Sequence, residues 1–394
     1  MPEVHIPIGP QHPALKEPVN FKVVVDGEKI VSLDLDISYN HRGIEKAAEK
    51  RDFIKVVPLL ARVCGICSHS HTTTFVKGIE EAMKIEIPER AQYIRTIIAE
   101  LERMHSHLLW LGVAAHEIGF NTLFMWTWRD LETIQDMLEE MTGNRVVYGI
   151  NEVGGVRRDL TPSQIQAAFN HLLKLEDRFS KYGEMVKSDQ NLQIRFRGVG
   201  KLTREEALKY GTVGPTARAS GVDYDIRRDE PYLAYAEVPW KVITDTHGDV
   251  WGRTLVRLGE MHESLKIVRY CLENLPAGPI SVPVPKTAPP SEILSRYEAP
   301  RGELVHFIRT NNTDKVERLD IRTPTMANWT SVAVSLVNQN IADIPVIVAA
   351  IDPCLSCTSR ITVLNGRGGK AGVMTWDDLR KRGCGKNNKG RSVS

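Results

Sequence analysis

The chain has 394 residues, a net charge of +2, 42% hydrophobic residues and 25% charged residues. This composition is ordinary for a globular protein with a large core, and the small net charge excludes a general attraction to nucleic acid or to anionic lipid. No run approaches the roughly 20 apolar residues that span a bilayer. The first residues also lack the basic and then apolar pattern of an export signal. We therefore expect no transmembrane segment, no export signal and no nucleic-acid partner.

Two β-prone runs near the start, 21–25 and 30–35, flank an Asp26-Gly27 turn and predict a hairpin. From about Gly43 onward, apolar residues recur at the three- and four-residue spacing that is typical of helices. The expected helical segments are 44–62, 89–111, 131–141, 162–187 and 251–275. The sequence therefore predicts an α+β fold that is mostly α, with a bundle of long helices and a small N-terminal antiparallel β-sheet.

The composition changes near the end of the chain. Residues 366–394 are rich in Gly, Lys, Arg, Asn and Ser and contain few apolar side chains. Such a segment cannot bury enough apolar surface to offset the entropy of ordering it. We therefore expect one domain over residues 1–360 and a basic C-terminal extension over 361–394.

Four of the six cysteines form two pairs with the same spacing, Cys64 with Cys67 and Cys354 with Cys357. Six cysteines are too few for a disulfide scaffold in a chain of this length. A separation of three residues at a turn or helix start places both sulfurs on one side of the backbone. Two pairs can then offer four thiolates to one site, and thiolates suit nickel, low-valent iron, zinc or an iron–sulfur cluster.

Spacing alone leaves several interpretations open. A structural zinc site also uses four thiolates, but its pairs usually lie roughly 15–20 residues apart, whereas nearly the whole chain separates these two. An iron–sulfur cluster, a redox disulfide and unrelated buried cysteines remain as alternatives. Cys271 lies on a helical pattern and is expected to be a buried apolar residue, and Cys384 in the basic tail is expected to be incidental.

The residues around the pairs narrow the choice. Arg-Val-Cys-Gly-Ile-Cys at 62–67 and Asp-Pro-Cys-Leu-Ser-Cys-Thr-Ser-Arg at 352–360 resemble the two signature motifs of nickel–iron hydrogenase large subunits. The resemblance implies a nickel ion held by all four cysteines, with Cys64 and Cys354 as terminal ligands. It also implies that Cys67 and Cys357 bridge to an iron that carries cyanide and carbon monoxide.

Other segments indicate a branch of that family. Residues 8–13, 154–159, 214–221 and 248–250 resemble the quinone-site subunit of respiratory complex I, and the resemblance covers about residues 3–360. These features are shared with the membrane-bound, energy-converting (group 4) hydrogenases. The complex I subunit lacks the four nickel-binding cysteines, so their presence here favours a hydrogenase.

The resemblance also assigns roles to four residues outside the cysteine pairs. Glu17 would pass protons to and from a terminal cysteine; the alternative is a surface glutamate beside Lys16. Arg301 would lie over the metals at the position where hydrogen binds; the alternative is a salt-bridged loop arginine. Asp352 would join the polar canopy of the site, and it is also a natural turn residue before proline. Glu45 matches a ligand of a magnesium or iron ion, although other members of this branch depart from that pattern.

Five histidines, at positions 12, 69, 71, 105 and 107, form an N-terminal set. His69 and His71 follow the first cysteine pair directly. They could hydrogen-bond cysteine sulfurs or a partner subunit, but a structural histidine with satisfied hydrogen bonds is the commoner case. No catalytic role is assigned to any of them.

The resemblance implies reversible reduction of protons to hydrogen, with electrons from ferredoxin. The chain has no spare cysteine set for iron–sulfur clusters, so these would belong to a small partner subunit. Membrane subunits would couple the reaction to ion translocation and hold the chain at the cytoplasmic side of the cell membrane. Nickel-insertion factors and a protease that cuts after Arg360 would mature it. The alternatives are a complex I-like quinone-site or coupling module without hydrogenase activity, and a zinc-bound structural protein.

Overall fold

The computed structural model describes residues 4–13, 15, 17–37 and 39–358. Its α-helices are α1 (Ile44–Ala48), α2 (Phe53–Leu60), α3 (Ser68–Met83), α4 (Glu89–Glu117), α5 (Asn121–Thr142), α6 (Pro162–Ser188), α7 (Gln190–Phe196), α8 (Arg204–Lys209), α9 (Gly214–Arg218), α10 (Ile226–Asp229), α11 (Val250–Glu273), α12 (Pro324–Leu336) and α13 (Ile344–Ala350). Its strands are β1 (Val4–Ile8), β2 (Asn20–Asp26), β3 (Lys29–Asp36), β4 (Asn151–Glu152), β5 (Gly155–Val156), β6 (Ser291–Ala299), β7 (Gly302–Thr310) and β8 (Val316–Arg322). Two 3-10 turns, η1 (Ile341–Asp343) and η2 (Leu355–Cys357), complete the elements. The predicted extension over 361–394 lies outside the described residues.

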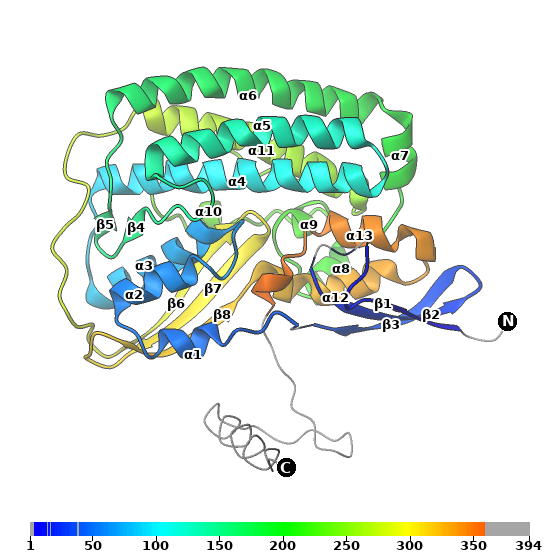
Figure 1. Ribbon diagram of the computed structural model, residues 1–394, viewed down its shortest axis with the longest axis horizontal. Coiled ribbons are helices and arrows are strands. Elements are labelled where there is room, and N and C mark those ends of the chain that lie inside the picture. Colours follow the sequence, from blue (N-terminus) through cyan, green and yellow to red (C-terminus); the bar gives the residue numbers. More distant parts are fainter. Residues whose placement is uncertain (1–3, 14, 16, 38, 359–394) are drawn as a thin grey trace, which may run out of the picture.

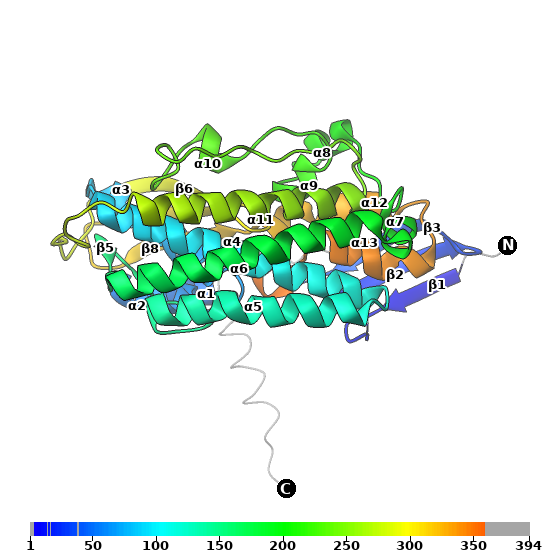
Figure 2. The same cartoon turned by 90° about the horizontal axis from the view of Figure 1, so that it is seen from above.

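The predicted bundle is confirmed: α4, α5, α6 and α11 lie side by side along the long axis of the molecule (Figures 1 and 2). Helix α4 is buried on every side over most of its length, because α5, α11 and α13 all pack against it. Helix α6 covers the outside and buries one face only. It begins at a capping box in which Thr161 and Gln164 bond reciprocally. In Figure 1 the bundle lies above a second layer that contains the sheet β6–β8 and the N-terminal sheet.

The second layer contains an antiparallel sheet with the order β6-β7-β8, against which α3 packs. The turn between β6 and β7 consists of Pro300 and Arg301 alone, since Ala299 pairs with Gly302. The sequence analysis did not predict this sheet. Its buried positions include Glu298 and His306, so no simple alternation of apolar and polar residues marks the strands.

At the N-terminus, the predicted hairpin is confirmed as β2 and β3, and β1 extends it to three strands. The predicted single helix over 44–62 is wrong, because α1 ends at Ala48 and α2 begins only at Phe53. Asp52 caps the start of α2 by accepting the backbone N–H of Lys55, while Phe53 N–H donates to the carbonyl of Asp314. In the part of the chain that the structure describes, no helix is both long and apolar enough to cross a bilayer.

Candidate metal centre

The two cysteine pairs meet beneath the helix bundle, although most of the chain separates them. Cys64 lies in the loop after α2, and Cys67 immediately precedes α3. Cys354 precedes η2, and Cys357 ends it. The Sγ atoms of Cys64 and Cys354 are 3.2 Å apart, and those of Cys67 and Cys357 are 3.9 Å apart. All four residues are at most 7% exposed, and none of them forms a disulfide.

These two distances fit pairs of thiolates that share a bound metal ion. With metal–sulfur bonds of about 2.3 Å, neighbouring thiolates around a four-coordinate ion lie about 3.3 Å apart in a square arrangement and about 3.8 Å apart in a tetrahedral one. Geometry by itself therefore admits nickel and zinc alike. No disulfide forms within either sequence pair. The sulfurs of Cys64, Cys354 and Cys357 all lie within 4.8 Å of one another and that of Cys67 lies 3.9 Å from Cys357, which unrelated buried cysteines do not explain.

The electrostatics of the cluster also call for a cation. Hydrogen bonds from the neighbouring thiols, that of Cys354 first, hold the pKa of Cys64 well below its usual value. The pKa values of Cys67 and Cys357 are raised, because each is hydrogen-bonded within the cluster, first to Cys354, and is buried beside a charged neighbour. The four groups cannot all ionise together in a buried site unless a positive ion balances them.

Arg301 and Asp352, two residues predicted from the resemblance, form one unit beside the sulfurs. The guanidinium of Arg301 donates to the carbonyl and Oδ1 of Asp352, both at 2.7 Å, and to Ser106 Oγ at 3.2 Å. Burial opposes the charge of Arg301, but Asp352 and the cysteine thiolates outweigh it and raise the pKa of this side chain. Asp352 has a left-handed backbone (φ 56°), and its Oδ2 is buried without a partner in the described part of the chain. The site therefore contains a permanently charged donor in a fixed position.

Two glycines set the position of Arg301. A Cβ atom on Gly214 would lie 2.3 Å from the carbonyl oxygen of Arg301, and one on Gly302 would lie 2.7 Å from the nitrogen of Gly214. Both glycines have positive φ angles, 69° and 127°. The segment 214–221, noted in the sequence for its resemblance to complex I, thus packs its backbone directly against the turn that carries Arg301.

A buried ion-pair network extends from this segment. Arg218 binds Glu260 of α11 and Glu298 of β6, each at 2.8 Å. Arg227 joins the same network through Asp225 and Glu100. Burial and the nearby charge of Asp225 raise the pKa of Glu298 to about 7, although Arg218 opposes them. The network ties α4, α9, α10 and α11 to the strand that leads into Arg301. Breaking a buried pair of this kind is costly, because it leaves a charge without compensation.

Glu17 lies against the second cysteine pair. Its Oε2 accepts the backbone N–H groups of Leu355 at 2.6 Å and Ser356 at 3.3 Å, and its Oε1 accepts the hydroxyl of Ser356. This carboxylate therefore caps the turn between Cys354 and Cys357. Because of these contacts, Glu17 is not an isolated surface glutamate.

Glu45 is placed less directly. Its Oε1 accepts the backbone N–H of Ile321 in β8 at 2.9 Å. Two residues further on, Thr323 donates through its hydroxyl to the carbonyl of Cys357 at 2.9 Å. Glu45 thus lies behind the second cysteine pair, separated from it by the end of β8. Its role as a magnesium or iron ligand stays a prediction.

Arg42 was not singled out from the sequence, yet it joins the two cysteine motifs. Its guanidinium donates to the carbonyls of Arg62 at 2.9 Å, Val63 at 2.7 Å and Ser356 at 3.0 Å. Val63 precedes Cys64 and Ser356 precedes Cys357, so one side chain holds both pairs in register. Nothing local marks Arg42 in the sequence, because its acceptors are backbone carbonyls far away in the chain.

Three of the N-terminal histidines, His69, His71 and His107, have different hydrogen-bond partners. His69 is turned toward the carbonyl of Arg95 (3.0 Å) and the side chain of Asn151, and His107 pairs with Glu260 at 2.8 Å. His71 alone among these three reaches the cluster, with its Nε2 3.7 Å from the Sγ of Cys357. On the other side of His71 lies His306, which the sequence analysis missed.

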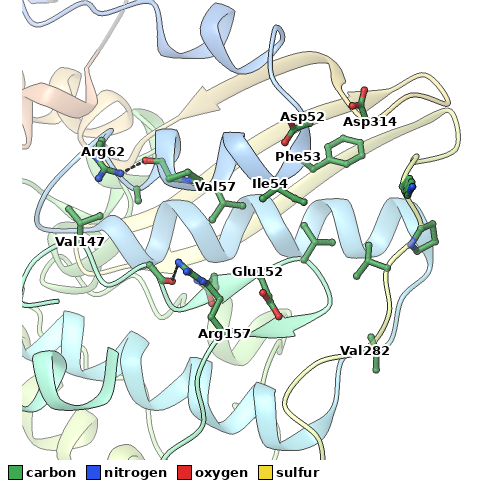
Figure 3. A pocket seen from close by; sticks show the side chains of 18 of the residues that line it. Asp52, Phe53, Ile54, Val57, Arg62, Val147, Glu152, Arg157, Val282 and Asp314 are labelled. Carbon is green, nitrogen blue, oxygen red and sulfur yellow. Dashed lines mark hydrogen bonds between the residues drawn. The ribbon is translucent and has the colours of Figure 1, made fainter. Parts of the chain in front are cut away.

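A groove opens beside the first cysteine motif, with a volume of about 920 Å³. In Figure 3, Ile54 and Val57 of α2 lie across it from Glu152 and Arg157. Arg62, two residues before Cys64, also lines it. Ile54 is 81% exposed, so it gives the groove an apolar rim.

The fold and the four-thiol site agree with comparisons to known families. Residues 42–113 match the family described as nickel-dependent hydrogenase. Residues 117–292 and 285–360 match the 49 kDa subunit of respiratory-chain NADH dehydrogenase. The chain therefore belongs to the family that joins the large subunits of membrane-bound nickel-dependent hydrogenases with the 49 kDa subunit of complex I. It is an oxidoreductase subunit of that family.

Individual relatives support the same placement. The chain is 40% identical to the membrane-bound hydrogenase subunit alpha of Pyrococcus furiosus, over 96% of this chain and 92% of that protein. It is also 40% identical to the carbon monoxide-induced hydrogenase of Rhodospirillum rubrum, over 90% of this chain and 99% of that protein. A chain of the archaeal membrane-bound sulfane sulfur reductase superposes with a TM-score of 0.87 at 29% identity, over 91% and 98% of the two chains.

The contact made by Arg42 generates a prediction. Arg42→Gln removes the fork that bridges Val63 and Ser356, so the two cysteine pairs are held less rigidly. We expect metal affinity to fall by about 10–100-fold, the usual effect of losing a group that orients metal ligands. The measurement is the metal retained per chain during timed exposure to a chelator.

Arg51→Gln is the matched control, because exposed Arg51, among the described residues, donates to the carbonyl of Ala47 in α1 and not to a cysteine motif. Arg42→Lys should behave like Arg42→Gln, since an ammonium lacks the planar fork. Equal metal retention in Arg42→Gln and Arg51→Gln would contradict the assignment.

Proposed function

We propose that this chain is the catalytic large subunit of an energy-converting nickel–iron hydrogenase, which reversibly reduces protons to hydrogen. The observation that carries the proposal is the convergence of four buried free thiols with a fixed arginine, Arg301, beside them. A structural zinc site has no evident need for a buried guanidinium next to its thiolates. A site that handles protons and diatomic molecules does.

In this proposal Cys64, Cys67, Cys354 and Cys357 would hold nickel, and Cys67 and Cys357 would also hold an iron that carries cyanide and carbon monoxide. When bound, these metals supply Lewis acidity and electron transfer. The protein contributes a buried site, a fixed positive charge at Arg301 and a carboxylate at Asp352 that keeps the guanidinium in place. Glu45 is retained as a candidate ligand for a magnesium or iron ion.

Glu17 is proposed to accept and return protons at the site. Its carboxylate accepts the N–H group of Leu355, the residue after Cys354, so it lies next to the second cysteine pair. A carboxyl group that touches this turn and also lines an open surface pocket with Gln11 and His12 can carry a proton outward.

Electrons would pass to an iron–sulfur cluster in a small partner subunit. The one further cysteine among the described residues is Cys271, which is fully buried in α11. Burial raises its pKa to about 12, so this thiol is not suited to bind a cluster. The groove beside Arg62 and Cys64 offers a partly apolar face for that subunit. Ferredoxin is proposed as the electron donor, and membrane subunits are proposed to translocate ions and to hold the chain at the cytoplasmic side of the membrane.

Two other functions remain as alternatives for the test. The relationship to the 49 kDa subunit and to a sulfane sulfur reductase complex favours, as the second candidate, a redox-coupled module without hydrogen chemistry. A zinc-bound structural site is the third, since the sulfur distances admit it.

Metal analysis of the purified complex tests the function. We expect stoichiometric nickel and iron, with infrared bands of cyanide and carbon monoxide, and hydrogen evolution from a reduced dye. Cys354→Ser should remove the bands and all measurable activity, because it removes a ligand and the nearest thiol to Cys64. Cys271→Ser should keep both, since Cys271 lies in α11 outside the cluster. Zinc without infrared bands would contradict the proposal.

The role of Glu17 can be separated from its capping contacts. Glu17→Gln keeps an oxygen acceptor for Leu355 and Ser356 but cannot carry a proton. We expect metal content to stay unchanged and hydrogen evolution to fall by about 100-fold or more, in the range for loss of a general acid–base group. Exposed Glu28→Gln in the β2–β3 turn is the control. Activity loss that only parallels metal loss would assign Glu17 a structural role instead.

The extension 361–394 lies outside the described residues, and we propose that it is a propeptide. The chain is expected to be cut after Arg360 once nickel is inserted, with the participation of nickel-insertion factors and a protease. The intact mass of the mature subunit decides this, and a mass that still includes Ser394 would contradict it.

A further inference from the structure

Two buried histidine rings lie in a row that ends at Cys357, one of the two cysteines proposed to hold the iron. His71 Nδ1 lies 3.3 Å from His306 Nε2, and His71 Nε2 lies 3.7 Å from the Sγ of Cys357. The rings are tilted by 31° with their centroids 5.5 Å apart. His71 follows from the first cysteine motif, whereas His306 comes from β7, so only the packing of α3 on the sheet brings them together.

The contact between His71 Nδ1 and His306 Nε2 is a hydrogen bond only if one of these two nitrogens carries a proton and the other carries a lone pair, so at least one of the rings is neutral. Each ring is at most 1% exposed. A neutral imidazole carries one N–H donor and one lone-pair acceptor, so the remaining question is which nitrogen of each ring holds the proton.

The ring nitrogen of His306 that does not face His71 decides where the protons lie. This atom, Nδ1, is buried and has no hydrogen-bond partner among the described residues. A proton on that atom would leave a buried N–H unpaired, which is the rarer and costlier defect in folded proteins. With the proton on Nε2 instead, His306 donates to the Nδ1 of His71. His71 must then carry its own proton on Nε2, where it points at the sulfur of Cys357.

The opposite arrangement would change the chemistry of the site. His71 would then direct a lone pair toward Cys67 and Cys357, and the ligand atoms of these three residues all lie within 4.8 Å of one another. That set could bind a metal ion by itself, because imidazole and thiolate together suit zinc. We propose that His306 is a positioning residue that fixes His71 as an N–H donor to the thiolate of Cys357 and prevents it from acting as a metal ligand.

The inference rests on the proposed function, because the bound metals provide the readout. An N–H group directed at a thiolate withdraws electron density from the sulfur and hence from a metal that it holds. Loss of this donor should make the iron richer in electrons, and the cyanide and carbon monoxide bands should then move to lower wavenumber.

The experiment compares infrared spectra and metal content of the purified complex with three substitutions. His306→Phe keeps a ring but removes the donor, and we expect its bands to shift to lower wavenumber. His306→Gln keeps an N–H that can reach His71, and we expect its bands to stay near the wild-type positions. Ile308→Val is the control, since Ile308 packs on the same face of β7 against Gly78 of α3 without any polar group.

The outcomes separate the two levels of the proposal. Wild-type complex without the bands would refute the hydrogenase function itself. Bands in wild type, with His306→Phe matching Ile308→Val, would overturn the role of His306 alone. If His306→Phe does not yield metal-loaded protein, His306→Leu, which also lacks a donor, takes its place: bands at lower wavenumber than in Ile308→Val support the inference, and bands that match Ile308→Val overturn it.

Discussion

The main constraint on this structure is that it must hold four thiols together at a buried site, where they repel one another once they are ionised. Cys64 and Cys354 come within 3.2 Å across 290 residues of chain. Closing so long a loop costs conformational entropy, and crowding buried thiolates adds an electrostatic cost. The fold meets the first cost with a large core of packed helices, and a bound cation would meet the second.

Around the sulfurs, each cysteine pair is held by contacts from elsewhere in the chain. Arg42 grips the backbone of both motifs, and Thr323 and Thr325 at the start of α12 bond the second pair through Cys357 and Cys354. Glu102 of α4 accepts the backbone N–H groups of His69 and Ser70 and so anchors the first turn of α3 behind Cys67. Metal ligands are thus oriented by a surrounding shell, which is what a site that must keep one geometry requires.

The same structure separates the two exits that hydrogen chemistry would need. Glu17 meets the second pair from the N-terminal loop, whereas the groove lined by Arg62 lies next to the first pair. Protons and electrons would leave by different sides of the cluster. Arg301 takes neither path; the packing of Gly214 and Gly302 and the buried pairs of Arg218 keep its turn rigid above the cysteines.

Local signals in the sequence were enough for the long helices, the β2–β3 hairpin and the four cysteines with their neighbours, because periodicity, turn chemistry and motif spacing are short-range properties. The sheet β6–β8 was missed because some of its buried positions are polar, namely Glu298 and His306. Its strands therefore lack the alternation of apolar and polar residues that predicts a strand. Only the tertiary structure decided that Arg42 clamps both motifs, that Glu17 caps η2 and that His306 stands behind His71. Each of these side chains reaches a residue more than 200 positions away, through backbone carbonyl or N–H groups or a buried ring, and no local pattern in a chain encodes such a partner.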